Sequence, residues 1–278
     1  MLRAVRFAAR LGFRIEPATM AAIVRLHASI TKVSPERIRD ELAFILTEGA
    51  ARRGFELLDQ TGLLADILPE IAAMKGVEQP PEFHPEGDVW VHTLMMLDGL
   101  RAPSLTLALG VLLHDVGKPP TFRIAERIRF DGHVDEGVRM ADDILKRLRF
   151  SSDEISQVEA LVANHMRFKD VPRMRESTLK RFLRLDRFAE QLELHRLDCL
   201  SSHRNLETYE FVKNKFEELP AEQLKPVLLL TGDDLIAAGY RPGPAFARML
   251  AAAEDAQLEH RVTTKEEALA LVRAEFPL

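Results

Sequence analysis

Residues 105–119 read Leu-Thr-Leu-Ala-Leu-Gly-Val-Leu-Leu-His-Asp-Val-Gly-Lys-Pro, and this stretch is the clearest indication of the fold class. Its first part, 105–113, carries no charged residue, which predicts a helix buried on all sides. Gly117 and Pro119 then end the helix and leave His114 and Asp115 in a turn. Buried charges are tolerated when they are paired or bind a metal. The stretch therefore predicts a metal site at the end of a core helix.

Further imidazole and carboxyl groups flank this stretch. They are His92 on its N-terminal side, followed on its C-terminal side by His133, His165 and Asp198. None of these residues forms a local helical pair, so they reach one point only if separate helices converge, as they do in helix bundles. Imidazole and carboxylate ligands suit divalent ions, and we expect a divalent ion such as Ni, Co, Mn, Fe, Mg or Zn. Two alternatives remain open: His165 as a histidine favoured by a helix C-terminus, and His195 in place of Asp198.

Composition supports an all-α protein. Alternating β-branched or aromatic runs are scarce, and the chain has one Trp and two Tyr residues. The net charge of −5 argues against a general nucleic-acid coat. The single cysteine, Cys199, excludes a disulfide framework, which fits a reducing cytoplasm. No stretch is apolar enough to span a bilayer, so we expect a cytoplasmic protein without a membrane partner.

Local signals predict the helices that carry these residues. We expect helices over about 88–101, 104–115, from 133 or 135 to 149, 151–165 and 187–201, with a Ser151–Glu154 capping box opening the fourth. The segment 69–85 contains one Gly and several Pro residues and is interpreted as a connector.

An amphipathic helix is expected at the N-terminus. Leu2, Val5 and Ala9 form its apolar stripe, and the basic residues Arg3, Arg6 and Arg10 form another. This basic stripe is either a solvated face or a surface that contacts RNA phosphates, since guanidinium groups match phosphate oxygens.

His92, His114-Asp115 and Asp198 resemble the H…HD…D signature of the HD phosphohydrolase superfamily, an α-helical fold that binds divalent metal. The resemblance implies that the first ion takes these four residues, and that the second shares Asp115 and adds His133 and His165. It also implies catalytic roles for Asp115 and Lys118: a metal-bound hydroxide attacks phosphorus while Lys118 neutralises phosphate charge. The implied substrate is a phosphoester or nucleotide, such as a 2′,3′-cyclic nucleotide.

A wider resemblance covers the whole chain. The segment 1–13 resembles the start of the neck of bacterial class II tRNA nucleotidyltransferases and poly(A) polymerases, and 34–42 resembles the family segment that follows it. Residues 231–235 with 242–244 resemble the C-terminal module of this family. The resemblance implies a helical neck and body over 1–80, an HD helical bundle over 81–203 and a small helical module over 204–278. The chain has no Asp-x-Asp motif. We therefore expect that the nucleotidyltransferase head is absent and that this chain alone adds no nucleotides.

Three functions follow from these observations. The first is a metal-dependent phosphohydrolase. The second is the tRNA-binding part of a CCA-adding enzyme or poly(A) polymerase, with no catalysis of its own. The third is an inactive truncated product whose N-terminal helix exposes apolar surface.

Overall fold

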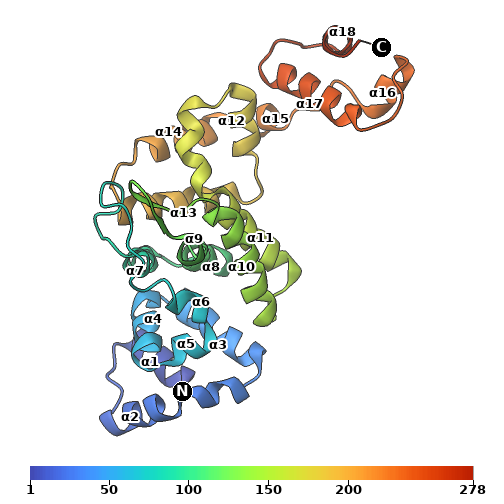
Figure 1. The fold of residues 1–278 in the computed structure, drawn as a ribbon. Helices are drawn as coiled ribbons and strands as arrows, with labels where there is room; N and C mark the ends of the chain where they lie inside the picture. The colour runs from blue at the N-terminus through green and yellow to red at the C-terminus, as the bar shows by residue number, and fades with distance from the viewer. Residues whose placement is uncertain (278) are drawn as a thin grey trace. The chain divides into compact units, whose positions relative to one another are not determined.

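The computed structural model describes residues 1–277 and, for Ala221, the backbone only. The chain divides into two units: the first comprises 1–168 and 189–206, and the second comprises 169–188 and 207 onward. Helices dominate both units, and among the described residues the only sheet is a two-stranded hairpin (Figure 1). The predicted all-α fold is confirmed.

The first unit contains the N-terminal helices, the buried core helix and the hairpin. In chain order its elements are α1 (Leu2–Leu11), α2 (Pro17–Leu26), η1 (His27–Lys32), α3 (Pro35–Thr47), α4 (Ala51–Gln60), α5 (Leu63–Ile67), α6 (Pro69–Ala72), α7 (Val89–Gly99), α8 (Leu105–Leu113), α9 (Lys118–Thr121), β1 (Arg123–Ile124), β2 (Ile128–Arg129), α10 (His133–Arg147) and α11 (Ser152–Asn164).

Two helices cross the boundary between the units, η2 (His165–Arg173) and α13 (Phe188–Ser201). The other elements of the second unit are α12 (Glu176–Leu183), α14 (Glu207–Glu218), α15 (Ala221–Leu224), α16 (Gly232–Ala237), α17 (Ala245–Leu258) and α18 (Lys265–Glu275). The division into 1–80, 81–203 and 204–278 stays a prediction.

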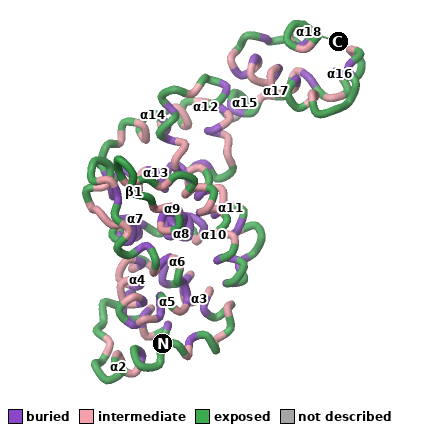
Figure 2. Tube along the Cα trace, in the orientation of Figure 1, coloured by how far each residue is buried: buried purple, intermediate pink, exposed green. Residues whose placement is uncertain are grey.

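The core of the first unit is built around α8. Every residue from Thr106 to Leu113 is buried (Figure 2), because α3, α7 and α11 pack around this helix. The uncharged run of 105–113 therefore has the environment expected for a helix that is apolar on all faces. This packing holds the end of α8, with His114 and Asp115, inside the protein.

The connector predicted at 69–85 has more structure than expected. It opens with the short helix α6, and a β-bridge joins Glu78 to Asp88. The Gln79 N–H also donates to the Gly87 carbonyl at 2.7 Å, and the Val89 N–H donates to that of Val77 at 3.1 Å. The connector thus folds back on itself before α7 begins. Among the described residues, no helix combines the length and apolarity needed to cross a bilayer.

Candidate metal centre

The turn after α8 is shaped by a glycine. A Cβ atom on Gly117 would lie 2.1 Å from the His133 carbonyl oxygen and 2.6 Å from the Gly137 backbone nitrogen. The missing side chain therefore lets the first turn of α10 approach the turn that carries His114 and Asp115. His133, the first residue of α10, is brought to the site by this contact.

The four predicted histidine ligands share one arrangement. In each ring Nδ1 is held by an oxygen atom: 2.6 Å from Glu86 Oε1 for His92, 2.9 Å from the Val111 carbonyl for His114, 2.8 Å from the Phe130 carbonyl for His133 and 2.7 Å from the Val162 carbonyl for His165. Their Nε2 atoms are buried, and none has a hydrogen-bond partner within the described part of the chain. Oxygen partners on Nδ1 are the arrangement that orients metal-ligating histidines and leaves the other nitrogen free to bind.

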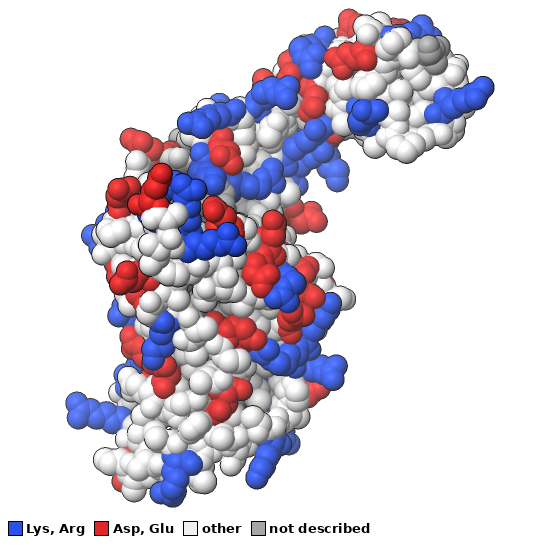
Figure 3. Space-filling view, viewed as in Figure 1, with Lys and Arg blue, Asp and Glu red and all other residues white. Residues whose placement is uncertain are grey.

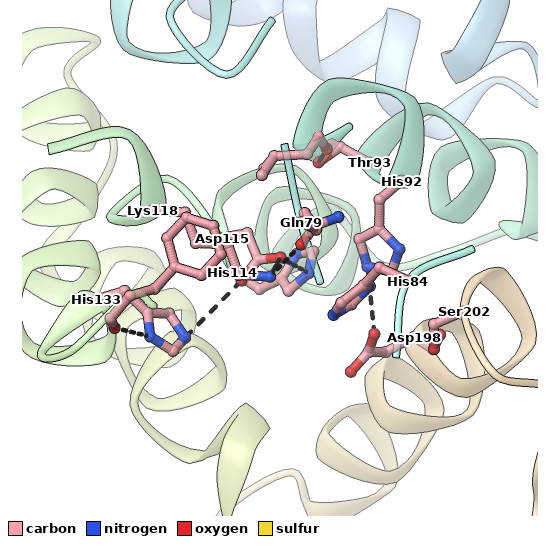
Figure 4. Close-up of polar contacts among 12 residues, drawn as sticks. Gln79, His84, His92, Thr93, His114, Asp115, Lys118, His133, Asp198 and Ser202 are labelled. Carbon is pink, nitrogen blue, oxygen red and sulfur yellow. Dashed lines mark hydrogen bonds and ion pairs between the residues drawn. The ribbon is translucent and has the colours of Figure 1, made fainter. Parts of the chain in front are cut away.

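The predicted carboxylates lie against these free nitrogens (Figure 4). Asp198 Oδ1 is 3.2 Å from His92 Nε2, and Asp115 Oδ2 is 3.2 Å from His114 Nε2. Asp115 Oδ1 is 4.0 Å from His133 Nε2 and 3.8 Å from His165 Nε2.

The structure thus brings all six predicted ligands together. Two groups of three residues have ligand atoms close enough together to hold an ion, and Asp115 belongs to both. The first group adds His92 and His114, and the second adds His133 and His165. An unpartnered, buried set of imidazole nitrogens beside two carboxylates fits a divalent cation.

The charges around the site keep its carboxylates ionised. Burial alone would raise the pKa of Asp115, but the neighbouring charges of His114 and Lys118 hold that pKa well below its ordinary value. Lys118 Nζ lies 2.6 Å from Asp115 Oδ2 and donates to Gln79 Oε1 at 2.6 Å. Burial likewise opposes ionisation of Asp198, yet the close approach of the His92 ring lowers the Asp198 pKa.

The imidazoles have divergent pKa values. Burial would lower the pKa of His92, but the carboxylates of Asp198 and Glu86 beside its two nitrogens outweigh burial and raise that pKa to about 9. Burial and the nearby charge of His114 lower the pKa of His165 to about 4, which keeps that ring neutral near pH 7. A neutral ring is the form that binds metal.

Three residues that the sequence analysis missed complete the site. Glu86 Oε1 accepts a hydrogen bond from His92 and lies 2.9 Å from His84 Nδ1. Burial would raise the pKa of Glu86, but the hydrogen bonds with these two histidines outweigh burial and lower that pKa to about 2. His84, Glu86 and His92 form a third group with metal-ligand spacing. Gln79 holds Lys118. The only sequence signal for them was the concentration of polar residues in the connector before α7.

The open choice between Asp198 and His195 is resolved by geometry. The His195 ring stacks on Phe168, with centroids 4.2 Å apart and planes 8° from parallel, and burial lowers its pKa to about 4. It packs beside Cys199, whose sulfur is 3.6 Å from Nε2. Asp198, three residues later, is the side chain that reaches His92.

The predicted phosphate-binding arginines of α1 lie over α3. Arg6 Nε is 2.9 Å from Glu41 Oε2, and the guanidinium lies against the rings of Phe7 and Phe44. Arg10 donates to Glu48 at 3.0 Å. Arg3 is the most open of the three, with 74% of its side chain exposed.

Two family models match the chain. Residues 12–75 match the model described as "Probable RNA and SrmB-binding site of polymerase A", and residues 135–272 match that of "tRNA nucleotidyltransferase domain 2".

Curated relatives and solved structures agree with these matches. The CC-adding tRNA nucleotidyltransferase of Thermus thermophilus is 36% identical over 98% of this chain and 65% of its own length. The Multifunctional CCA protein of Halorhodospira halophila is 45% identical over 54% of this chain and 37% of its own. The fold is similar to that of a CCA-adding enzyme with CTP, with a TM-score of 0.56 and 17% identity over 100% of this chain and 59% of that chain. It is also similar to that of the Thermotoga maritima CCA-adding enzyme complexed with tRNA, with a TM-score of 0.52 and 17% identity over 99% of this chain and 60% of that chain.

These relatives correct one prediction. They are CCA-adding tRNA nucleotidyltransferases, so the interpretation of the chain as a metal-dependent phosphohydrolase is wrong. The reason is that a cluster of His and Asp side chains defines what can bind, while the reaction depends on the rest of the site. The hydrolytic roles of Asp115 and Lys118 are withdrawn with that reaction.

Proposed function

Since the chain belongs to the class II CCA-adding tRNA nucleotidyltransferase and poly(A) polymerase family, as part of its helical body and tail, we propose that it binds tRNA for addition of nucleotides to the tRNA 3′ end. The observation that carries the proposal is the 36% identity with a CC-adding enzyme along 98% of the chain. The match of 12–75 to an RNA-binding region supports the same role.

The α1 arginines are proposed to contact RNA phosphates. Arg3 and Arg10 retain exposed guanidinium groups, with 74% and 48% of their side chains accessible. Arg6, which is 11% exposed and packed on Glu41, would orient the helix beneath them. Guanidinium groups pair with phosphate oxygens through two parallel hydrogen bonds.

We further propose that His92, His114, Asp115, His133, His165 and Asp198 hold one or two divalent cations. The four orphaned Nε2 atoms support this assignment. A bound cation would supply positive charge next to Asp115 and Asp198. It would also link the helices that contribute its ligands.

Binding of a fluorescein-labelled tRNA transcript, followed by anisotropy between about 50 and about 200 mM NaCl, tests the tRNA proposal. The wild-type chain should bind with an affinity that falls steeply with salt. In an Arg3→Gln/Arg10→Gln variant the slope of log affinity against log salt should become shallower by about 2, because about one unit is lost per phosphate contact.

An Arg139→Gln/Lys146→Gln variant is the charge-matched control. Both of these side chains lie on α10 and are already paired with acidic neighbours, Arg139 with Glu136 and Lys146 with Asp142. Absence of tRNA binding by the wild-type chain would reject the proposed function. Equal slopes in the two variants would reject the role of the α1 arginines.

A further inference from the structure

The hairpin that follows the metal centre has an unusual charge arrangement. β1 and β2 pair antiparallel, with Arg123 opposite Arg129 and Ile124 opposite Ile128. The turn closes with a hydrogen bond from the Ala125 N–H to the Arg127 carbonyl at 3.1 Å. Two arginines therefore lie directly across from each other on one face of a two-residue ladder, with a third in the turn.

This arrangement is unfavourable in the free protein. Like charges directly opposite on paired strands destabilise a sheet. Arg123, Arg127 and Arg129 are exposed, and no hydrogen bond or ion pair from their side chains to an acidic group is found in the described part of the chain. Figure 3 shows basic side chains gathered on the face where Figure 2 labels β1, with acidic ones beside them.

Basic residues on α10, in contrast, are paired with acidic side chains. Arg139 pairs with Glu136 and Asp143, and Lys146 pairs with Asp142. The hairpin itself offers only Glu126, at the turn. Three unpaired guanidinium groups on one short element fit a partner that supplies several negative charges at once.

The base of the hairpin adds half-exposed aromatic surface. Phe122 precedes β1 and Phe130 follows β2, and their ring centroids are 5.8 Å apart with planes inclined by 53°. Lys118 Nζ lies 5.4 Å from the centre of the Phe130 ring, and the Phe130 carbonyl holds His133 Nδ1. The base of the hairpin therefore contacts Lys118 and His133, two residues of the metal centre.

We propose that residues 122–130, the arginine hairpin, form a second RNA-binding element. Its arginines contact backbone phosphates, and Phe122 and Phe130 offer a surface on which an unpaired base stacks. Cationic groups interleaved with aromatic rings are the combination that single-stranded nucleic acid binds, whereas an acidic protein partner would account for the arginines without requiring the rings. This inference rests on the proposed function but uses residues outside the matched RNA-binding region of 12–75.

Anisotropy titrations of the full chain with the labelled tRNA transcript test this element. In the variant Arg123→Gln/Arg127→Gln/Arg129→Gln we expect affinity at about 100 mM NaCl to fall at least about tenfold and the salt slope to become shallower by about 2 to 3. The substituted side chains are exposed, so helical circular dichroism should be unchanged. The control removes three charges elsewhere in the same unit, Arg101→Gln/Arg139→Gln/Lys146→Gln.

The outcomes separate this inference from the proposed function. Loss of affinity in the hairpin variant, with the control close to wild type, supports the arginine hairpin. Equal losses in the hairpin and control variants overturn it, since net charge alone would explain them. If tRNA binding stays intact in the hairpin variant while binding to poly-glutamate falls, the hairpin has a protein partner and the inference is overturned, although the proposed function stands. If the wild-type chain binds no tRNA, both fail.

Discussion

Glu86 determines how His92 is presented to the site. Its Oε1 atom is 2.6 Å from His92 Nδ1 and only 4% of its side chain is exposed. This carboxylate fixes the tautomer that leaves Nε2 facing Asp198. Outer carboxylates of this kind orient the ring and raise its basicity as a ligand.

We therefore expect Glu86→Gln to weaken binding of Co²⁺, followed by its visible absorption, by about 10- to 100-fold. Asp115→Asn, which alters the carboxylate shared by both ligand groups, should abolish binding. Glu82→Gln, on an exposed residue of the same connector, is the control. Wild-type Co²⁺ affinity in Glu86→Gln would show that Glu86 does not orient a ligand.

The close packing around Gly117 predicts that a larger residue there destabilises the fold. A Cβ at this position would meet backbone atoms of His133 and Gly137, which cannot move aside as a flexible side chain would. Gly117→Ala should lower the free energy of unfolding by about 1 to 3 kcal/mol, as overpacking does. Urea denaturation measures this. Gly243→Ala, whose added Cβ would lie 4.0 Å from the Arg241 carbonyl oxygen, should stay close to wild type, and equal effects would contradict the steric argument.

The sequence reveals ligands more readily than the residues that hold them. His92, His114 and Asp115 stand out because their side chains are costly to bury on apolar helices. Glu86 and Gln79 lie in a segment without helical periodicity, so no helical pattern distinguishes them from the other polar residues of the connector. Their roles arise when the connector folds back through the bridge between Glu78 and Asp88.

At the scale of the helix, one start signal in the sequence is confirmed in detail. The predicted capping box of α11 is present: Glu154 N–H donates to Ser151 Oγ, and Ser151 N–H donates to Glu154. The helix predicted to begin at 133 or 135 and to end at 149 begins at His133 and ends at Arg147. Capping depends on residues that are three apart, so the sequence alone predicts it. The convergence of α7, α8, α10 and α13 cannot be predicted in this way, because it depends on packing between segments that are distant in the chain.

Contacts between α12 and α17 predict a pH effect on stability. Arg181 and Arg184 donate to Glu254 at 2.5 and 2.7 Å. Burial opposes ionisation of Glu254, but these hydrogen bonds outweigh it and lower its pKa below the ordinary value. A lowered pKa in the folded state means that the stabilisation is present above the ordinary pKa and is lost as the pH falls below it.

Glu254→Gln should therefore cost about 1 to 3 kcal/mol at pH 7, since it removes charge-assisted hydrogen bonds. The difference from wild type should shrink as the pH is lowered from about 5 towards 3. Chemical denaturation at several pH values measures both. Glu275→Gln, on an exposed residue of α18, is the control. A difference that does not change with pH would contradict the electrostatic explanation.

At the scale of the molecule, the two units have separate cores. The first is centred on α8, and a second cluster joins α16, α17 and α18 through residues such as Leu235, Met249 and Val272. The second unit also takes in 169–188, where the Phe188 ring lies 4.9 Å from that of Phe216. No local pattern predicts this pairing, because it joins residues that are distant in the chain.

Separate cores predict separate responses to a cavity. Leu235 is fully buried in the second cluster, so Leu235→Ala should cost that unit about 2 to 5 kcal/mol. Trp90, the single tryptophan, lies in the first unit and reports on it alone. In Leu235→Ala, circular dichroism should show an earlier loss of helix on heating, while the Trp90 fluorescence midpoint and the Co²⁺ affinity stay unchanged. Ile236→Ala, at a half-exposed neighbour, should alter neither signal. A Trp90 midpoint that falls together with the helical signal would mean that the two cores unfold as one, and the metal centre would then depend on the second unit for its stability.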